Sequence, residues 1–475
     1  TKFPIFDYSI IRPAGKKIRG FGGTSSGFEP LKKLHERVES FLDNFCAGFI
    51  EVDGKKKEYN HTRLIADIFN SIGACVVAGN VRRSAEICIG DVDDETFMNL
   101  KNYEMNPERM DIGWMSNNSV SLKERHNYSD FSYIPEFANR VIDNGEPGMI
   151  NLVNIQKYGR YGKKMKDDAY LVNPCGEICL ESKELCNLSE TFPPRCKDED
   201  TWKKALEYAT FYASTVSLLP THRPETNAVI SRNRRIGVSI SGIAQWASNE
   251  IPDGWGGMNY TKMTRCLRDG YGIVRKENSR LAKSAGVPES IRVTTVKPSG
   301  SISLLAGCTP GVHYPVSRYA IRRMRIGMDS PLVQGLKDAN IPWEKDTYSD
   351  KTLVFSFAIY HGNLRAAKDV SPWEQFKLAE MMQRCYVDNS VSCTIYFDKK
   401  DAVDVEKMLS MFIPVLKCVS LLPRNDHKYA QAPYEEITKE QYEKRLSEYS
   451  RPNFDNVKGN EPVGSKFCTG EKCMI

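Results

Sequence analysis

The residues with the clearest chemical potential lie in one short segment, NPCGEICLESKELC, which runs from Asn173 to Cys186. Cys175 stands between a proline and a glycine, which hold a chain in a tight turn rather than in a packed element. Glu177 follows two residues later. A thiol at a loop tip beside a carboxylate can serve as a one-electron or nucleophilic centre next to a general base. Cys186 could form a redox couple with another thiol.

Other interpretations of these cysteines follow from their spacing. A zinc site would use Cys175, Cys179, Cys186 and Cys196, but no C-x2-C pair occurs among them, so we expect no metal ligand here. The C-x3-C-x2-C motif of a radical-SAM cluster is not complete here, because its third cysteine position is occupied by Ser182. Burial is common for a free cysteine and suits Cys179, which lies between two apolar residues.

A second pair of thiols, Cys468 and Cys473, lies close to the end of the chain, after a segment that contains proline and glycine. A mobile dithiol of this kind could enter a site, exchange with a disulfide there and then be reduced outside. The alternatives are an inert tail and a metal half-site, which we do not favour because no further cysteine pair is near. We therefore expect a flexible tail over residues 451–475, after a main unit over residues 1–450.

A turn of small residues, KPSGSIS, begins at Lys297 after a β-branched run. Small hydroxyl residues and glycine let backbone N–H groups turn toward an anion, which makes Ser299, Gly300 and Ser301 candidate phosphate contacts. The segment is neither a Walker A loop nor a G-x-G-x-x-G motif. From these residues alone, an ordinary glycine turn is the better interpretation.

Helix and strand patterns alternate around these segments and favour an α/β fold. The signals are periodic apolar residues, capping residues and β-branched runs. The expected helices cover residues 31–45, 95–101, 202–219 and 372–387, the last one opened by a capping box at Ser371. The expected strands cover residues 85–89, 291–296 and 391–397, the last one half-buried because apolar and polar residues alternate.

Composition excludes several classes of protein. The chain has 475 residues, of which 41% are hydrophobic, and its 66 basic and 60 acidic residues give a formal charge of +6. It is too apolar for a disordered chain, and no run of about 18 apolar residues could span a membrane. Its 14 cysteines are too dilute for a small disulfide scaffold. Since no secretory signal opens the chain, we expect a cytoplasmic protein with reduced thiols and no nucleic-acid or membrane partner.

Several motifs, in order along the chain, resemble those of the ribonucleotide reductases. They are the cysteine segment, the glycine-rich loop from Arg19 to Gly27, and the segments at 79–86, 144–148, 232–237 and 295–301. The stretch LLAGCTPGVHYPVSRYAIRRMR, from Leu304 to Arg325, is similar to that of the monomeric, adenosylcobalamin-dependent (class II) ribonucleoside-triphosphate reductases. The resemblance covers nearly the whole chain and corresponds to the C-terminal two-thirds of such an enzyme.

This resemblance implies the reduction of ribonucleoside triphosphates to 2′-deoxyribonucleoside triphosphates by a thiyl radical, with adenosylcobalamin as cofactor. Cys175 would carry the radical that removes the 3′ hydrogen of the substrate. Glu177 would take the proton of the 3′ hydroxyl, and Asn173 would hydrogen-bond the ribose. Cys186 would be half of the dithiol that reduces the sugar. A radical centre must be shielded from solvent, so these residues belong inside a closed fold.

The resemblance also implies ligand-binding segments and partners. Thioredoxin would pass electrons to the tail thiols Cys468 and Cys473, and a deoxynucleotide effector would act on substrate choice. Substrate phosphates would lie on Ser299, Gly300 and Ser301. The substrate-specificity loop would contain Gly22, Gly23, Thr24 and Ser25.

The implied fold is a ten-stranded α/β barrel of the ribonucleotide reductase and glycyl-radical type, with the Cys175 loop at its centre. In the family, the thiol partner of Cys186 precedes the glycine-rich loop, but no cysteine does so here. Because the chain opens at Thr1, we expect a fragment or split protein without its N-terminal barrel elements. One alternative is a nucleotide-binding subunit that needs a separate N-terminal chain. The other is the large subunit of a diiron-dependent reductase, against which the stretch from Leu304 to Arg325 argues.

Overall fold

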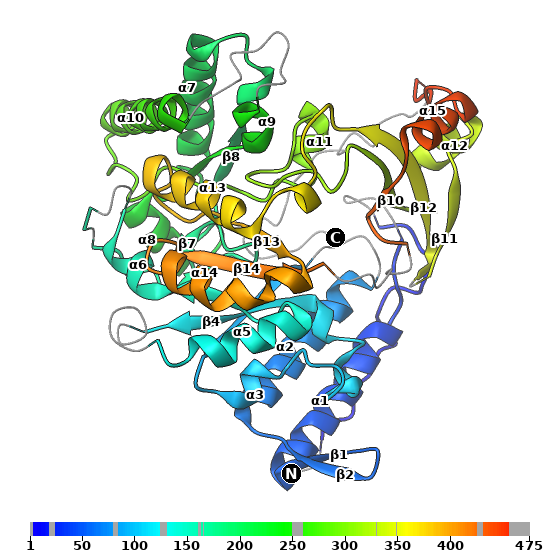
Figure 1. The fold of residues 1–475 in the computed structure, drawn as a ribbon. Coiled ribbons are helices and arrows are strands. Elements are labelled where there is room, and N and C mark those ends of the chain that lie inside the picture. The colour runs from blue at the N-terminus through cyan, green and yellow to red at the C-terminus, as the bar shows by residue number, and fades with distance from the viewer. Residues whose placement is uncertain are drawn as a thin grey trace.

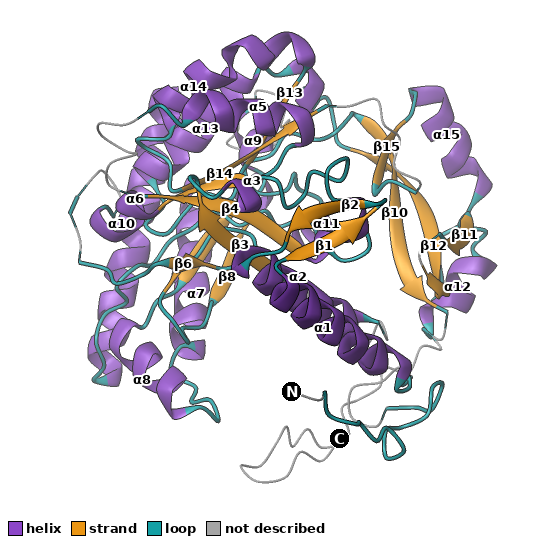
Figure 2. Ribbon diagram, turned by 90° about the horizontal axis from the view of Figure 1, so that it is seen from below, coloured by secondary structure: helices purple, strands orange, loops and turns teal. Residues whose placement is uncertain are grey.

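The structure is a computed structural model of the chain, shown in two views in Figures 1 and 2. It describes residues 3–18, 24–78, 84–123, 131–159, 163–164, 166–248, 260–328, 330–347, 349–424 and 431–455.

A mixed sheet runs through the centre of the molecule (Figure 1). Its strand order is β13-β14-β5-β4-β3, and neighbours are parallel except where β14 meets β5. Two parallel single-residue bridges, Val296 to Val391 and Val238 to Thr294, continue it toward the parallel pair β8-β9. The strands of this series are β3 (Glu86–Asp91), β4 (Ser116–Leu122), β5 (Gly148–Asn151), β8 (Leu188–Thr191), β9 (Gly237–Ile240), β13 (Thr394–Phe397) and β14 (Cys418–Pro423).

Helices pack on this series and bury the main apolar core against it. Two aromatic contacts belong to that core: Phe376 stacks on Phe412 with ring centroids 4.9 Å apart, and Trp202 lies 5.1 Å from Trp246. The helices around the series are α5 (Ile134–Asn144), α6 (Leu152–Lys157), α7 (Glu199–Val216), α8 (Pro224–Asn233), α9 (Ile243–Ala247), α10 (Tyr260–Ala285), α11 (Ile302–Ala306), α13 (Pro372–Cys385) and α14 (Val405–Phe412).

Two further groups of elements flank the centre. An antiparallel sheet of order β11-β12-β10-β15 stands at the right of Figure 1 with two helices, and the N-terminal helices lie below the central sheet with a small hairpin. The first group contains β10 (Tyr319–Gly327), α12 (Leu332–Asp338), β11 (Trp343–Asp346), β12 (Ser349–Tyr360), β15 (Tyr434–Glu436) and α15 (Lys439–Glu448). The second contains α1 (Glu29–Ala47), β1 (Phe49–Val52), β2 (Lys55–Glu58), α2 (His61–Val77) and α3 (Glu95–Met98).

Most expected elements are confirmed, and two differ for identifiable reasons. The helices expected at 31–45, 202–219 and 372–387 are α1, α7 and α13. The helix expected to reach residue 101 ends at Met98, where the Asn99 side chain donates to the Glu95 carbonyl 2.9 Å away and competes with the helical pattern.

The segment expected as a strand over 291–296 makes backbone hydrogen bonds to a neighbour on each side, but only as isolated bridges and not as a continuous strand. Val238 N–H donates to the Val293 carbonyl (2.8 Å) on one side, and Val296 N–H donates to the Ser390 carbonyl (3.3 Å) on the other. The expected alternation over 391–397 is confirmed, since the odd-numbered residues are buried and the even-numbered ones are partly exposed.

The architecture is therefore α/β, as expected, with helices around mixed sheets. The strand pairings among the described residues do not close into a ring of ten. Within the same part of the chain, no helix is long and apolar enough to cross a membrane.

Candidate active site

Cys175 lies at the tip of a tight hairpin formed by β6 (Leu171–Val172) and β7 (Cys179–Leu180). Asn173 closes the turn twice: its carbonyl accepts from Gly176 N–H (2.8 Å), and its Oδ1 accepts from Ile178 N–H (2.9 Å). Gly176 has φ +81°, a conformation that L-residues rarely adopt. The Pro174-Cys175-Gly176 sequence therefore presents Cys175 at a loop tip, as predicted, but the described residues leave it exposed and not shielded as a radical centre requires.

The central sheet curves around this hairpin. Asn117 on β4 donates its amide to the Pro174 carbonyl (2.8 Å), and Ser392 Oγ donates to the Cys175 carbonyl (2.6 Å). The segment that contains Ser392 leads into β13, which is separated from β4 by β14 and β5. Two segments so far apart in the strand order can touch one hairpin tip only if the sheet wraps around it.

Glu177 is buried behind the tip, with 2% of its surface exposed. Its carbonyl accepts from Thr295 Oγ1 (2.7 Å) and from Ser390 N–H (3.0 Å), so its backbone is fixed. Burial raises the pKa of the Glu177 carboxyl, although a hydrogen bond with Asn173 and the charge of Lys297 oppose this. Its Oε2 atom is buried without a partner among the described residues, which suits a group that accepts a proton from a ligand.

Cys186 belongs to the same cluster. Burial raises the pKa of its thiol to about 12, and the charges of Glu177 and Cys175 act in the same direction. The Lys297 ammonium opposes them. Because each of these groups acts on the charge of another, Cys175, Glu177 and Cys186 lie in one cluster. Cys179 is fully buried in an apolar cluster with Cys418, as predicted.

The predicted phosphate loop follows Lys297. Ser299 has φ +46°, unusual for a residue with a side chain, and its hydroxyl accepts from Gly311 N–H at 2.8 Å. That hydroxyl also bonds Ser241 inside the protein. Gly300 and Ser301 are exposed, and no atom lies within 4 Å of where a Cβ on Gly300 would stand. The open surface of the loop is therefore at Gly300 and Ser301.

Sequence reasoning missed the electrostatic roles of two charged residues at this site. Lys297 was noted as part of the loop, but its charge also lowers the pKa values of Cys175, Glu177, Cys186 and Glu190. Glu190 is a carboxyl on β8 that no motif marks. The only signal in the sequence was its position four residues after Cys186, on the strand that leaves the cysteine segment.

A buried ion cluster anchors the base of the cysteine segment. Arg235 donates two hydrogen bonds to Asp167 (both 2.9 Å) and one to Glu184 (3.0 Å), which lies just before Cys186. Arg292 donates to Asp167 as well. Burial alone would raise the pKa of Asp167, but the two guanidinium groups outweigh it and hold that pKa well below its usual range.

A cavity of about 320 Å³ opens beside the hairpin tip. It is bounded by the tip, the ends of β4, β5 and β14, and the residues before β13, so Cys175 faces a half-open cavity of ligand size. Its lining includes Asn117, Asn118, Glu146, Cys175, Pro298, Ser392, Cys393 and Cys418.

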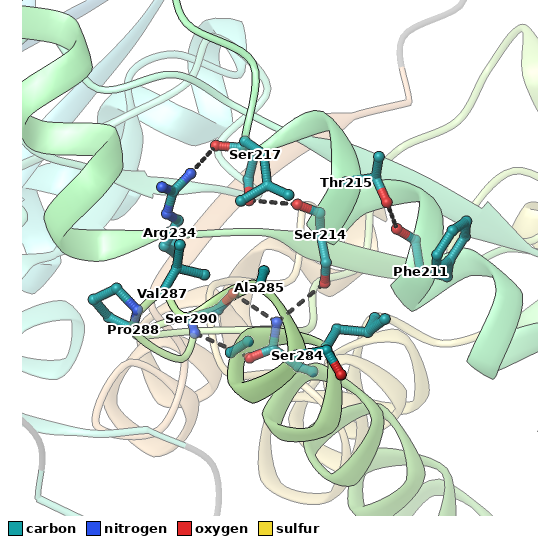
Figure 3. A pocket seen from close by; sticks show the side chains of 14 residues that line it. Phe211, Ser214, Thr215, Ser217, Arg234, Ser284, Ala285, Val287, Pro288 and Ser290 are labelled. Atoms are coloured by element: carbon teal, nitrogen blue, oxygen red, sulfur yellow. Dashed lines mark hydrogen bonds between the residues drawn. The ribbon is translucent and has the colours of Figure 1, made fainter.

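A second cavity, of about 230 Å³, lies between α7 and the end of α10 (Figure 3). Figure 3 shows Arg234 donating to the Ser217 carbonyl at its rim. The Asn278 side-chain amide donates to the Ser214 hydroxyl (3.1 Å). None of the described residues lining it is among those predicted from the sequence.

The remaining predicted residues lie away from this cluster or outside the described chain. Thr24 bridges to Lys17, and Ser25 donates to the Arg12 carbonyl (2.9 Å), so both bond within their own N-terminal turn. Gly22, Gly23, Cys468 and Cys473 lie outside the described residues. In the described part of the chain, no three His, Cys, Asp or Glu side chains are grouped so as to hold a metal ion.

Comparison with known proteins identifies the fold first. The chain matches a crystal structure of a B12-dependent (class II) ribonucleotide reductase with a TM-score of 0.76 and 33% identity, covering 94% of this chain and 63% of that one. A class Id ribonucleotide reductase α subunit from Actinobacillus ureae matches with a TM-score of 0.53 at 15% identity, which bears on the fold alone. The fold is that of ribonucleotide reductase catalytic chains.

Curated relatives with similar sequences indicate which kind of ribonucleotide reductase the chain resembles. The adenosylcobalamin-dependent ribonucleoside-triphosphate reductase of Euglena gracilis is 42% identical over 484 residues, 99% of this chain and 63% of the relative. A probable reductase of the same name from Dictyostelium discoideum is 39% identical, with 99% and 61% covered, and that of Lactobacillus leichmannii is 37% identical, with 99% and 66% covered. No protein-family model matches.

The resemblance inferred from the motifs is thus confirmed: the chain is homologous, along nearly its whole length, to adenosylcobalamin-dependent ribonucleoside-triphosphate reductases. It spans 61–63% of the length of the first two of these relatives.

Proposed function

We propose that this chain carries the catalytic centre of an adenosylcobalamin-dependent reductase that converts ribonucleoside triphosphates to 2′-deoxyribonucleoside triphosphates. One observation supports this most: Cys175, Glu177 and Cys186 meet at a hairpin tip that a curved sheet surrounds, in a homologue of such reductases. We also propose that the sheet series from β8 to β3 is part of a ten-stranded barrel, whose further strands are not among those described.

Each residue of the cluster has a role that its surroundings favour. The exposed Cys175 thiol would become the radical that takes the 3′ hydrogen atom of the ribose. The unpartnered Oε2 of Glu177 would accept the proton of the 3′ hydroxyl, and Asn173 would orient that carboxyl and contact the ribose. Cys186, with a second thiol, would supply the two reducing electrons, so that the 2′ hydroxyl leaves as water and the dithiol becomes a disulfide.

The cavity at the hairpin tip has room for a nucleoside but not for a whole corrinoid, so only the adenosyl part of the cofactor that the homology implies would enter it. Its volume lies in the range of small-molecule sites, and the amides of Asn117 and Asn118 and the face of Pro298 line it beside the Cys175 thiol. These residues would hold the adenosyl part of adenosylcobalamin. When bound, that cofactor supplies the homolytic chemistry that removes the hydrogen atom from the Cys175 thiol.

The binding partners are part of the same proposal. The triphosphate would lie on the loop of Ser299, Gly300 and Ser301, of which Gly300 and Ser301 are open to a ligand. A deoxynucleotide effector would act through the loop of Gly22, Gly23, Thr24 and Ser25. Thioredoxin would reduce the disulfide of Cys468 and Cys473 back to two thiols in the cytoplasm, where thiols stay reduced.

Electron paramagnetic resonance tests the proposed chemistry. The chain would be mixed anaerobically with adenosylcobalamin, a ribonucleoside triphosphate and a deoxynucleotide. We expect a coupled cobalt and thiyl signal that is lost in Cys175→Ala and kept in Cys46→Ala, which changes an exposed cysteine on α1. A signal that survives in Cys175→Ala would refute the assignment of the radical.

The tail is tested separately. Cys468→Ser should leave a single turnover intact but stop repeated turnover with thioredoxin as reductant, because the dithiol that exchanges with the internal disulfide is lost. Normal recycling in that variant would exclude the proposed role of the tail.

A further inference from the structure

The two carboxyl oxygens of Glu190 differ in their hydrogen bonds. It lies on β8 opposite Ser239 of β9, and its Oε1 accepts hydrogen bonds from Ser239 Oγ (3.0 Å) and Ser241 Oγ (2.6 Å). Its Oε2 atom is buried and has no partner among the described residues. One oxygen therefore accepts from two hydroxyl donors, while the other is buried with no partner among the described residues.

The two serines bonded to Glu190 hold the phosphate loop. Ser239 Oγ accepts from Lys297 N–H (2.9 Å), and Ser241 Oγ bonds the Ser299 hydroxyl. Because Ser241 gives its proton to Glu190, Ser299 must be the donor in that second contact. We call Ser239, Ser241 and Ser299 the serine bridge. Glu190 sets the direction of every hydroxyl proton in it.

The serine bridge holds the backbone of Ser299 in an unfavourable conformation. Ser299 adopts the left-handed φ of +46°, which is costly for a residue with a Cβ. Gly311 N–H donates to both Ser299 Oγ (2.8 Å) and Ser241 Oγ (3.2 Å), so this strained residue is held from two sides. Such a conformation persists only where surrounding contacts enforce it, and here it presents Gly300 and Ser301 outward.

Glu190 also faces the catalytic end of the site. Burial raises the pKa of its carboxyl to about 7, and the Glu177 charge raises it further, while both serines and Lys297 oppose this. Tyr386, after α13, is the other titratable group it acts on, and its hydroxyl donates to the Val238 carbonyl (3.1 Å). Protonation of Glu190 near neutral pH thus changes the charge between the Glu177 end and the phosphate end.

We propose that Glu190 is a positioning residue, which holds the Lys297–Ser299 loop through the serine bridge in the form that accepts a nucleoside triphosphate. The inference rests on the proposed function, since it assumes that this loop binds the substrate phosphates. It adds a residue that acts on both ends of the site without itself reacting. With Glu190 neutral, the bridge is intact and no negative charge lies beneath the triphosphate; with Glu190 ionised, that charge opposes phosphate binding.

The test compares the binding of ATP and adenosine to the full chain by calorimetry between pH 6 and pH 8. The variants are Glu190→Gln, which keeps an acceptor oxygen and is always neutral, and Glu190→Ala, which removes the anchor. Glu86→Gln is the matched control, because burial also raises the pKa of Glu86, which lies on β3 outside the cavity lining.

We expect Glu190→Ala to weaken ATP binding about tenfold, because both serine hydroxyls lose their shared acceptor, and to leave adenosine binding unchanged. Wild type and Glu86→Gln should lose ATP affinity from pH 6 to pH 8 relative to Glu190→Gln, which stays neutral throughout. Parallel pH profiles of ATP affinity for wild type and Glu190→Gln would overturn the role of Glu190 but not the proposed function. Equal losses of affinity for ATP and adenosine in Glu190→Ala would do the same.

The two proposals fail in different ways. If wild type binds neither ATP nor any other ribonucleoside triphosphate, the proposed nucleotide site is wrong and the role of Glu190 falls with it. If Glu190→Ala does not fold, the pH comparison of Glu190→Gln with wild type still decides the role of Glu190.

Discussion

Replacing Arg235 by methionine should release the base of the cysteine segment. The change removes three hydrogen bonds and leaves Asp167 and Glu184 as buried carboxylates with fewer partners. Breaking a buried ion pair on one side costs about 3–5 kcal/mol. Asp167 keeps Arg292, and Glu184 keeps the amide of Asn233 (3.0 Å). We therefore expect the lower end of that range, about 3 kcal/mol of the free energy of unfolding.

The matched control is Arg232→Met, three residues earlier on α8. The Arg232 side chain is 59% exposed and pairs with Glu181, whose side chain is 13% exposed. Exposed ion pairs contribute about 0–1 kcal/mol, so this variant should unfold nearly like wild type. The contrast between two arginines of one run isolates burial as the cause.

Urea unfolding at pH 7, followed by circular dichroism, measures both variants. The alkylation rate of Cys186 in the native state should rise in Arg235→Met and not in Arg232→Met, because the segment that buries this thiol loosens. A loss below about 1 kcal/mol in Arg235→Met, with unchanged Cys186 reactivity, would refute the view that the ion cluster anchors the segment. Arg235→Lys keeps the charge but not the two-pronged contact, and should lie between the two.

Three other outcomes are expected. Gly176→Ala should cost about 1–2 kcal/mol in urea unfolding because φ is +81°, whereas Gly272→Ala inside α10 should be neutral or stabilising by up to about 1 kcal/mol, since its Cβ would meet open space. Burial raises the pKa of Glu190 from 4.5 to about 7. The contribution of Glu190 to the free energy of unfolding is therefore fully present below pH 4.5 and is lost as the pH rises through 7. Unfolding of Glu190→Gln should lack this slope, worth about 3 kcal/mol, and an identical slope would contradict it. Burial raises the pKa of Cys186 to about 12, so iodoacetamide should label it far more slowly at pH 8 than the exposed Cys46, and equal rates by mass spectrometry would show that the thiol is not buried.

The local features of the site follow from neighbouring residues in the chain. Proline and glycine around Cys175 dictate a tight turn, and the structure has that turn, with Glu177 behind it and Cys186 nearby. Apolar periodicity and capping residues predicted α1, α7 and α13 because those signals depend on neighbours in the chain. The ordered motifs predicted the homology that the relatives confirm.

Only the tertiary structure decided which distant groups surround that segment. Lys297 opposes the raised pKa values of Cys175 and Cys186, Arg235 bonds Glu184 in the cysteine segment, and Glu190 interacts with the Glu177 charge. These contacts join separate strands and loops, so the motifs around Lys297 and Arg235 did not predict them. The strand expected over 291–296 is broken because its partners on both sides, rather than its own β-branched residues, decide where bridges form. Hydrogen bonds and charges between residues far apart in sequence depend on how the sheet curves, which composition and spacing do not encode.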